Sequence, residues 1–241
     1  MVNKNPNHEI SPVCQICGQK NASIFCNSKS EHLNEISSKI VSNTFKKGQT
    51  IFNEGSYPFG VFCINSGQVK LTHLGDDGKE QITRLLKGGD IVGYRALLSE
   101  ERYGATAVAL VDSKICFIPK ELFIHILKND AAITFEMMKL LADELHKTEM
   151  KMIHLAQKSI RERLAEILLT IKETYGFEKD GITLNTHLLR EDIANLIGIA
   201  TESAIRLLSE FNRDKIIELD GKKIKIINQE KLEKTANLRD E

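Results

Sequence analysis

Three cysteines near the start of the chain are the residues best suited to chemistry. Cys14 and Cys17 form a Cys-x2-Cys pair, and Cys26 follows after eight intervening residues, all within the polar stretch SPVCQICGQKNASIFCNS. Thiolates in such a cluster bind zinc or iron–sulfur centres, and a Cys-x2-Cys pair can also be a dithiol switch. The pair does not open a helix after a strand, as thioredoxin-like motifs do. The three thiols are therefore loose thiols, a redox pair, or metal ligands that need a fourth.

Composition narrows these alternatives. The 241 residues are 41% hydrophobic and 27% charged, with 33 basic residues balanced by 33 acidic ones. With this balance the whole protein has no net electrostatic attraction to nucleic acid or membrane surfaces, although a local basic patch can still bind DNA. The start MVNKNPNHEI has no apolar signal segment, and no apolar run approaches the roughly 18 residues of a membrane span. We expect a cytoplasmic protein with no membrane partner, whose reducing surroundings favour metal or redox chemistry over a disulfide framework.

The elements that must position these cysteines begin with a polar leader, residues 1–29. Residues 30–43 have apolar residues at helical spacing and predict a short amphipathic helix. From Phe45 to Pro119, short β-rich runs alternate with turn signals such as Ser66-Gly67 and Asp77-Gly78. Short strands at such intervals predict an antiparallel double-stranded β-helix, or jelly roll.

After Pro119 the apolar period becomes helical. Between about residues 132 and 156 the intervals are 3, 4, 3, 4 and 3, the a/d seam of a coiled coil. Such a narrow seam predicts pairing with a second copy of the chain, and the alternative is a helix packed on the barrel. The polar seam residue would weaken the pairing and make it tunable. The seam consists of Met138, Leu141, Leu145, Thr148, Met152 and Leu155.

Residues 160–241 predict a compact α/β module. A helix stopped by Gly176 is followed by REDIANLIG, by a second helix in TESAIRLLSEFNRD, and by the hairpin KIIELDGKKIKIIN. Helix, tight turn at Gly198, and helix is the order of a helix-turn-helix, and the hairpin with its Asp220-Gly221 turn would be its wing. Two packed helices in any α/β domain remain the alternative. On the second helix, we expect a buried side made of Ile205, Leu208 and Phe211, with Leu207 nearby.

The start of that second helix carries the polar residues that could read DNA. Thr201, Glu202, Ser203 and Arg206 lie near its N-terminus, the end that a recognition helix inserts into the major groove. Arg can bind guanine O6 and N7, and Glu can accept from cytosine N4. Glu202 and Arg206 are four residues apart and can instead form an ordinary surface ion pair. Residues 159–241 contain 14 Lys and Arg against 16 Asp and Glu, a net charge of −2. Affinity must therefore come from specific contacts and from two copies acting together.

The order and spacing of several short motifs resemble the Crp/Fnr family of bacterial transcription regulators. The resemblance covers nearly the whole chain and rests on KKGQTIFNEG, INSGQVKL, GDDGKEQIT and GGDIVG, on the seam helix, and on REDIANLIG followed by ESAIRLL. It implies an α+β protein with a β-roll sensor of the cNMP-binding type, a dimerisation helix, and a C-terminal winged helix-turn-helix. It also implies a homodimer that binds palindromic promoter DNA and contacts RNA polymerase.

The resemblance assigns the family's DNA-reading Glu and Arg to Glu202 and Arg206, and a phosphate contact to Arg190. Ile205 stands where relatives often have Ser or Gly, so this chain departs from them in its half-site reading. Ala200 occupies the usual N-cap position, which leaves Thr201 as cap or phosphate contact. Wing residues are further expected phosphate contacts, namely Lys222 and Lys223.

Cyclic nucleotide is not the expected effector. Relatives that bind cAMP carry a Glu for the ribose and an Arg-Ser pair for the phosphate, where this chain has Tyr94 and Gly104-Ala105. An anionic phosphate without those donors would lose roughly 1.5–3 kcal/mol of charge-assisted bonding. Arg102 and Thr106 stand close enough in the sequence to be considered as substitutes.

The positions of the cysteines also resemble those of one group within the family. Fnr-type oxygen sensors resemble this chain in having an N-terminal cysteine cluster and one distant cysteine before the dimerisation helix. The resemblance implies a [4Fe-4S] cluster on Cys14, Cys17, Cys26 and Cys116. The gap between the second and third cysteines is longer than in enterobacterial relatives, but loop closure costs rise slowly with length. Zinc, thiol redox, haem on His73, another small molecule, and a constitutive DNA binder with a vestigial sensor remain alternatives.

These inferences give one overall prediction. We expect a leader at 1–29, a β-roll sensor at 30–128, a dimerisation helix at 129–158 and a winged helix-turn-helix at 159–241. The expected function is that of a dimeric DNA-binding transcription regulator sensing oxygen, nitric oxide or redox state. No paired acid/base groups, nucleophile elbow or Walker-type loop indicate an enzyme.

Overall fold

The computed structural model describes residues 23–27, 38–76 and 78–237. Cys14 and Cys17 lie outside these ranges, and so does most of the predicted helix at 30–43. The chain divides into two compact units, one of residues 1–73 with 86–145 and one of residues 74–85 with 146–241.

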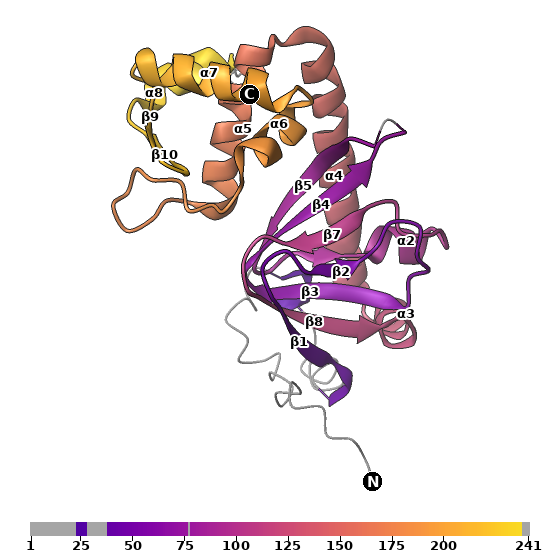
Figure 1. The fold of residues 1–241 in the computed structure, drawn as a ribbon. Coiled ribbons are helices and arrows are strands. Elements are labelled where there is room, and N and C mark those ends of the chain that lie inside the picture. Colours follow the sequence, from indigo (N-terminus) through magenta and orange to yellow (C-terminus); the bar gives the residue numbers. More distant parts are fainter. Residues whose placement is uncertain (1–22, 28–37, 77, 238–241) are drawn as a thin grey trace. The chain divides into compact units, whose positions relative to one another are not determined.

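The β-roll consists of two four-stranded sheets (Figure 1). One sheet has the order β1-β8-β3-β6 and the other the order β2-β7-β4-β5, with the described pairings antiparallel. This arrangement confirms the predicted jelly roll. The strands are β1 (Val41–Phe45), β2 (Thr50–Phe52), β3 (Gly60–Ser66), β4 (Gln68–Leu74), β5 (Glu80–Lys87), β6 (Ile91–Val92), β7 (Thr106–Ala109) and β8 (Ser113–Pro119).

Alternation along β3 and β8 creates two apolar cores. Ile64 and Ile115 belong to the cluster inside the roll. Their neighbours Cys63 and Cys116 point to the opposite face and contact a second cluster. That outer cluster also receives residues from helices and from the leader, so the sheet is covered on both faces.

The prediction of a helix up to residue 43 is wrong at its C-terminal end. The chain is helical at Ser38 and Lys39, and it becomes strand β1 at Val41. Residues Val41 to Phe45 pair with Phe117 to Ser113 of β8. Local helical spacing cannot compete with this long-range ladder, in which a strand completes the sheet edge.

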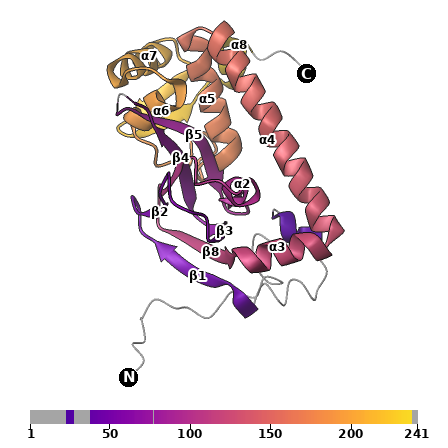
Figure 2. The same cartoon turned by 90° about the vertical axis from the view of Figure 1, so that its right-hand side faces the viewer.

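The helices that follow are α2 (Tyr94–Leu98) and α3 (Lys120–Asn129) in the first unit, and α4 (Ala131–Gln157), which begins in the first unit and continues into the second. The break between α3 and α4 is held by Asp130, whose Oδ1 accepts from the N–H groups of Ala132 and Ile133 at 3.1 and 3.3 Å. Figure 2 shows α4 as one continuous helix after α3. Its 27 residues span about 40 Å at 1.5 Å per residue.

The C-terminal unit contains the predicted helices and hairpin. These are α5 (Ile160–Tyr175), α6 (Arg190–Ile197), α7 (Thr201–Arg213), β9 (Ile217–Asp220) and β10 (Lys223–Ile226). A further helix, α8 (Gln229–Ala236), was not predicted and packs on α5. Helix α5 begins with a capping box, in which Ser159 Oγ accepts from Glu162 N–H and the Glu162 carboxylate accepts from Ser159 N–H. Among the helices of the described ranges, none has the length and apolarity of a membrane span.

Candidate nucleic-acid interface and thiol site

The turn between α6 and α7 has the geometry that a helix-turn-helix requires. Gly198 ends α6 with φ 70° and ψ 45°, a left-handed conformation that glycine adopts without strain. The same helix begins where the N–H of Leu189 donates to the Asp192 carboxylate at 2.7 Å. Arg163 of α5 donates to the carbonyl of Ile197 at 3.0 Å and so ties the turn to the module.

Helix α7 has a sharply divided surface. Its buried side consists of Ala204, Leu207, Leu208 and Phe211. The expectation that Ile205 belongs to this side is wrong, because its side chain is 47% exposed. Residues 204, 207, 208 and 211 follow the i, i+3, i+4, i+7 pattern of one helix face, and position 205 is turned away from it.

The exposed side of α7 brings together the residues expected to read bases. Glu202, Ile205 and Arg206 are all exposed there, and Ser203 is half-buried. Glu202 and Arg206 form no ion pair with each other among the described residues, so neither charge is neutralised by the other. The surface therefore presents an acceptor, an apolar group and a guanidinium within one helical turn and a half.

The first turn of α7 lacks a side-chain cap. The N-cap residue is Ala200, and Thr201 is the first helical residue. The N–H groups of an uncapped first turn have no intrahelical acceptor, and they carry the positive end of the helix dipole. The start of α7 is thus suited to approach an anionic group.

The wing is already held to the module by two of the predicted phosphate contacts. Arg190 Nη2 donates to the carbonyl of Gly221 in the wing turn at 3.1 Å. Partial burial lowers the pKa of its guanidinium, which stays charged at neutral pH. Lys223 Nζ lies 2.7 Å from Glu178, and this hydrogen bond raises the pKa of the lysine. Lys222, at the tip, forms no ion pair within the described part of the chain.

The predicted seam is exposed on the single chain. Met138, Leu145, Met152 and Leu155 are between 53% and 68% exposed, and Leu141 is 37% exposed. The helix also has a buried side, where Ile133 and Met137 pack onto the outer core of the β-roll. One face of this helix therefore packs on the chain's own barrel, and the apolar residues of the predicted seam are left exposed on the described chain.

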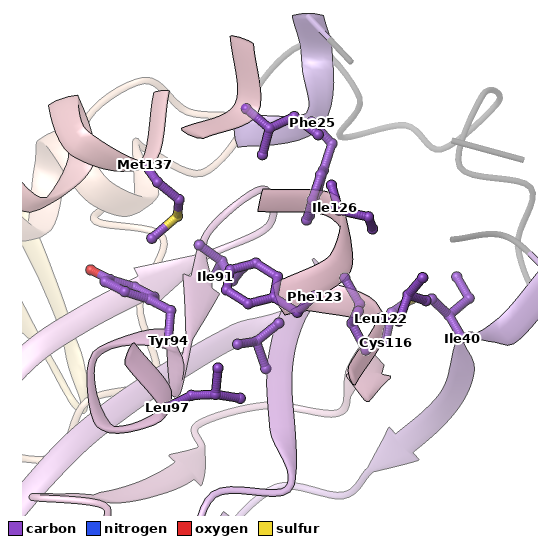
Figure 3. Packing of buried hydrophobic residues seen from close by; sticks show 13 residues of the cluster. Phe25, Ile40, Ile91, Tyr94, Leu97, Cys116, Leu122, Phe123, Ile126 and Met137 are labelled. Atoms are coloured by element: carbon purple, nitrogen blue, oxygen red, sulfur yellow. The ribbon is translucent and has the colours of Figure 1, made fainter. Parts of the chain in front are cut away.

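The residues that were compared with a cyclic-nucleotide site make contacts within the chain. Tyr94 is 3% exposed and belongs to the outer core with Met137, whose side chain points toward the Tyr94 ring in Figure 3. Arg102 donates to the Gly55 carbonyl and to the Tyr57 hydroxyl, both at 2.8 Å, so its guanidinium already has acceptors. Thr106 Oγ1 accepts from the Glu54 N–H at 3.0 Å.

Tyr103 is also buried and hydrogen-bonded within the chain. Its hydroxyl donates to the carbonyl of Gly60 at 3.2 Å, and burial raises the pKa of the phenol to about 12. His73, considered as a haem ligand, pairs with Glu54 through Nδ1 at 2.5 Å.

Cys116 lies on the face of its sheet that meets the leader. It is 7% exposed, in the outer core, with Ile40 and Leu122 (Figure 3). Phe25, in the short 3-10 helix η3 (Ile24–Asn27), belongs to the same core. Cys26 follows Phe25 directly, but its side chain lies outside the described part of the structure. Within residues 23–27, 38–76 and 78–237, no three cysteine, histidine or acidic side chains are grouped to hold a metal.

Sequence reasoning missed two features of these sites. Cys63 is the direct cross-strand neighbour of Cys116, a pairing between segments more than 50 residues apart. Near the start of α5, Glu166 accepts from His154 and Lys158 at 2.6 and 2.9 Å. The spacing of His154, Lys158 and Glu166 in the sequence forms no recognisable pattern. Which of these side chains come together depends on the break between α4 and α5.

An antiparallel β-roll, a long helix with an exposed apolar seam, and a winged helix-turn-helix together define a DNA-binding transcription regulator with a sensor domain. Comparisons with known proteins agree. Residues 42–130 match the cyclic nucleotide-binding domain family, and residues 162–235 match the Crp-like helix-turn-helix domain.

Relatives and solved structures extend the match along the chain. The chain is 30% identical over 196 residues to the fumarate and nitrate reduction regulatory protein of Vibrio cholerae, covering 80% of this chain and 77% of that protein. It is 32% identical over 192 residues to the anaerobic regulatory protein of Bacillus subtilis, covering 79% of each. The structure of FixK2 from Bradyrhizobium japonicum has the same fold, with a TM-score of 0.74, 23% identity and coverage of 83% and 99%. The chain belongs to the Crp/Fnr family of transcription regulators, which are not enzymes.

Proposed function

We propose that this chain is a homodimeric, cytoplasmic transcription regulator that binds palindromic promoter DNA and responds to oxygen or nitric oxide through a [4Fe-4S] cluster. Cys14, Cys17, Cys26 and Cys116 would be the ligands. RNA polymerase would be its partner at the promoter, as for the family. The relatives named as a fumarate and nitrate reduction regulatory protein and as an anaerobic regulatory protein support this response.

The observation that carries the proposal is the composition of the outer core. Phe25 of the leader, Cys116 of β8, and Ile133 and Met137 of α4 all belong to one buried cluster. The cluster links the segment next to Cys26 with the helix that presents the seam. A change at the leader can therefore reach α4 through direct packing.

Among the described residues, the position of Cys116 is compatible with a thiolate-ligated group. The Cys116 thiol is on the outer face of its sheet, in the core that Phe25 shares, and not inside the roll. Soft thiolates are the donors that iron–sulfur clusters take. When bound, the cluster would supply a centre that oxygen or nitric oxide degrades.

The chain's own residues would convert that event into weaker DNA binding. With the leader fixed at Cys116, Phe25 stays in the outer core and holds Met137 and the first turns of α4. Once the leader is released, Phe25 can leave the core, and α4 loses packing on one side. The seams of two chains would then pair less well. The two recognition helices would lose the spacing of one DNA turn, about 34–36 Å, that a palindromic site demands.

Within each half-site, α7 would read the major groove. Arg206 would donate to guanine O6 and N7, and Glu202 would accept from cytosine N4. Ile205, exposed between them, would contact the C5-methyl group of thymine, the one apolar group in the groove. The uncapped start of α7 with Thr201 and Ser203, and the wing with Lys222 and Lys223, would approach phosphates, and Arg190 would hold the wing turn beside them.

The proposal is tested by protein purified without oxygen and assayed for iron and acid-labile sulfide. We expect about four iron and four sulfide per chain, and a large loss of both in Cys116→Ser. The matched control is Cys63→Ser, which removes the neighbouring thiol and keeps the expected ligands. Stoichiometric zinc without iron would overturn the cluster, and so would full iron in Cys116→Ser.

A further inference from the structure

Cys63 and Cys116 face each other across two neighbouring strands. In the antiparallel pairing of β3 with β8, Cys63 is the direct partner of Cys116, between the pairs Phe62–Phe117 and Ile64–Ile115. Side chains of directly opposite residues emerge on the same face of the sheet. The two thiols are therefore neighbours although 52 residues separate them in the sequence.

The directions in which the main-chain groups of β3 point show whether Cys63 and Cys116 form a hydrogen-bonded or a non-hydrogen-bonded pair. The N–H of Ile64 donates to Asp90 at 2.9 Å, and its carbonyl accepts from Gly89 at 2.8 Å, so Ile64 faces the β6 side. The main chain of the preceding residue must face β8, because successive residues alternate. Cys63 and Cys116 thus form a hydrogen-bonded pair, for which the Cα atoms are about 5.5 Å apart. That separation is within the roughly 4.4–6.8 Å over which disulfides form.

The two cysteines differ in how deeply they are buried. Cys63 is half-buried, and Cys116 is 7% exposed in the outer core. A small reagent can therefore reach Cys63 first, and Cys116 is held next to it by the strand pairing.

We propose that Cys63 and Cys116 are a dithiol site that a low-molecular-weight disulfide oxidises to a reversible cross-strand disulfide. The Cys63 sulfur attacks the small disulfide, forming a mixed disulfide and releasing one small thiol. The Cys116 sulfur then attacks the Cys63 sulfur and displaces the second small thiol. The two protein sulfurs are oxidised, the small disulfide is reduced, and the two protein thiol protons end on the two released thiols.

The sheet geometry indicates that the bond is easily reduced again. Opposite Cβ atoms in a sheet are about 4.5–5.5 Å apart, whereas a disulfide holds them at about 3.5–4.5 Å. The strands must therefore draw together locally, and strained disulfides have more oxidising potentials and act as regulatory bonds. Oxidation would also occupy Cys116. The site is thus a second redox input that goes beyond the proposed cluster and competes with it for Cys116.

The test uses the full-length chain with Cys14→Ser, Cys17→Ser and Cys26→Ser, which leaves Cys63 and Cys116 as the only thiols of the five. The variant is incubated with glutathione disulfide under nitrogen, alkylated in denaturant and analysed by mass spectrometry. We expect a monomer that has lost two hydrogen masses, takes no alkyl label, and yields a linked peptide pair containing Cys63 and Cys116. Dithiothreitol should restore two labelled sites. The control with an added Cys63→Val should keep Cys116 alkylated and form no linked pair.

Two results would overturn the site. One is glutathione retained on Cys63 while Cys116 still takes the alkyl label. The other is full labelling of both residues after oxidation. The wild-type chain, stripped of metal with a chelator and oxidised in the same way, guards against misfolding of the variant. It should yield the same Cys63–Cys116 pair, and a link from Cys116 to a leader cysteine instead would contradict the proposal. Because the triple variant lacks three proposed cluster ligands, its outcome is independent of whether the protein binds iron.

Discussion

Nδ1 of His154, near the end of α4, lies 2.6 Å from Oε1 of Glu166 in α5. The other oxygen of Glu166 accepts from Lys158 Nζ at 2.9 Å. The side chains are only 20%, 23% and 7% exposed for His154, Glu166 and Lys158. This carboxylate therefore bridges the break between α4 and α5, through which the proposed pairing of α4 would act on α7.

Replacing Glu166 should destabilise this junction. In Glu166→Ala the ammonium of Lys158 stays largely buried without its carboxylate, which should lower the free energy of unfolding by about 1–3 kcal/mol. Urea unfolding followed by circular dichroism measures the effect. Glu230→Gln is the control, because Glu230 and Lys234 form an exposed pair on one helix, and an exposed ion pair contributes little to stability. Equal losses in the two variants would refute a special role for the junction.

The exposed seam of α4 predicts an assembly that a single charge can break. Leu145 is 61% exposed on the isolated chain, and Leu145→Glu would bury a carboxylate against its copy in the dimer. We expect light scattering of the iron-loaded variant under nitrogen to give the monomer mass. Lys147→Glu introduces the same side chain away from the seam and should leave the dimer intact. A dimer in Leu145→Glu would mean that the chains associate elsewhere.

Arg206 should carry base specificity rather than general affinity. Loss of a bidentate guanine contact costs about 1–3 kcal/mol, so Arg206→Ala should weaken promoter binding roughly 5- to 150-fold in anisotropy titrations. Replacing the contacted G·C pair should then leave the affinity of the variant unchanged, although it lowers the affinity of the wild-type protein. Arg213→Ala removes the same charge from the other end of α7 and should retain the wild type's preference. Full discrimination by Arg206→Ala would exclude the proposed contact.

Ile205 gives a prediction that can be tested on the DNA. If its exposed side chain contacts a thymine methyl, replacing that thymine by deoxyuridine removes one apolar group worth about 0.8 kcal/mol, or roughly fourfold in affinity. Wild-type protein should show this loss at one position of each half-site. Ile205→Ser should bind both DNAs equally, whereas Ile205→Val should still discriminate. Equal affinity of wild-type protein for both DNAs at every thymine would contradict this role.

Much of this architecture could be predicted because short-range sequence patterns indicate it. Turn signals between short β-rich runs predict the roll, glycines at 176 and 198 predict the helix ends, and the 3-4 spacing predicts the α4 seam. Ile205 could not be placed from its spacing. An i, i+3, i+6 series through Leu208 and Phe211 fits a buried face by spacing alone, but the true face keeps these two residues and has Ala204 and Leu207 instead of Ile205.

Long-range pairings could not be predicted. The strand at Val41 forms because β8 offers a free edge to it, whereas its own residues fit a helix equally well. The register that sets Cys63 against Cys116 depends on how two distant strands align, and a slip of one residue would separate the thiols. For the same reason, the partnership of His154 with Glu166 becomes visible only once the break between α4 and α5 is fixed.

In the proposed mechanism, thiolate ligation at the leader and Cys116 controls DNA binding by α7. The most direct test is one anaerobic, iron-loaded sample titrated onto a palindromic promoter fragment by anisotropy, before and after exposure to air, with iron measured each time. We predict tight binding under nitrogen, at least tenfold weaker binding (about 1.4 kcal/mol) after air together with loss of iron, and weak binding in both gases for Cys116→Ser. Unchanged affinity in air, or wild-type affinity in Cys116→Ser, would contradict the account.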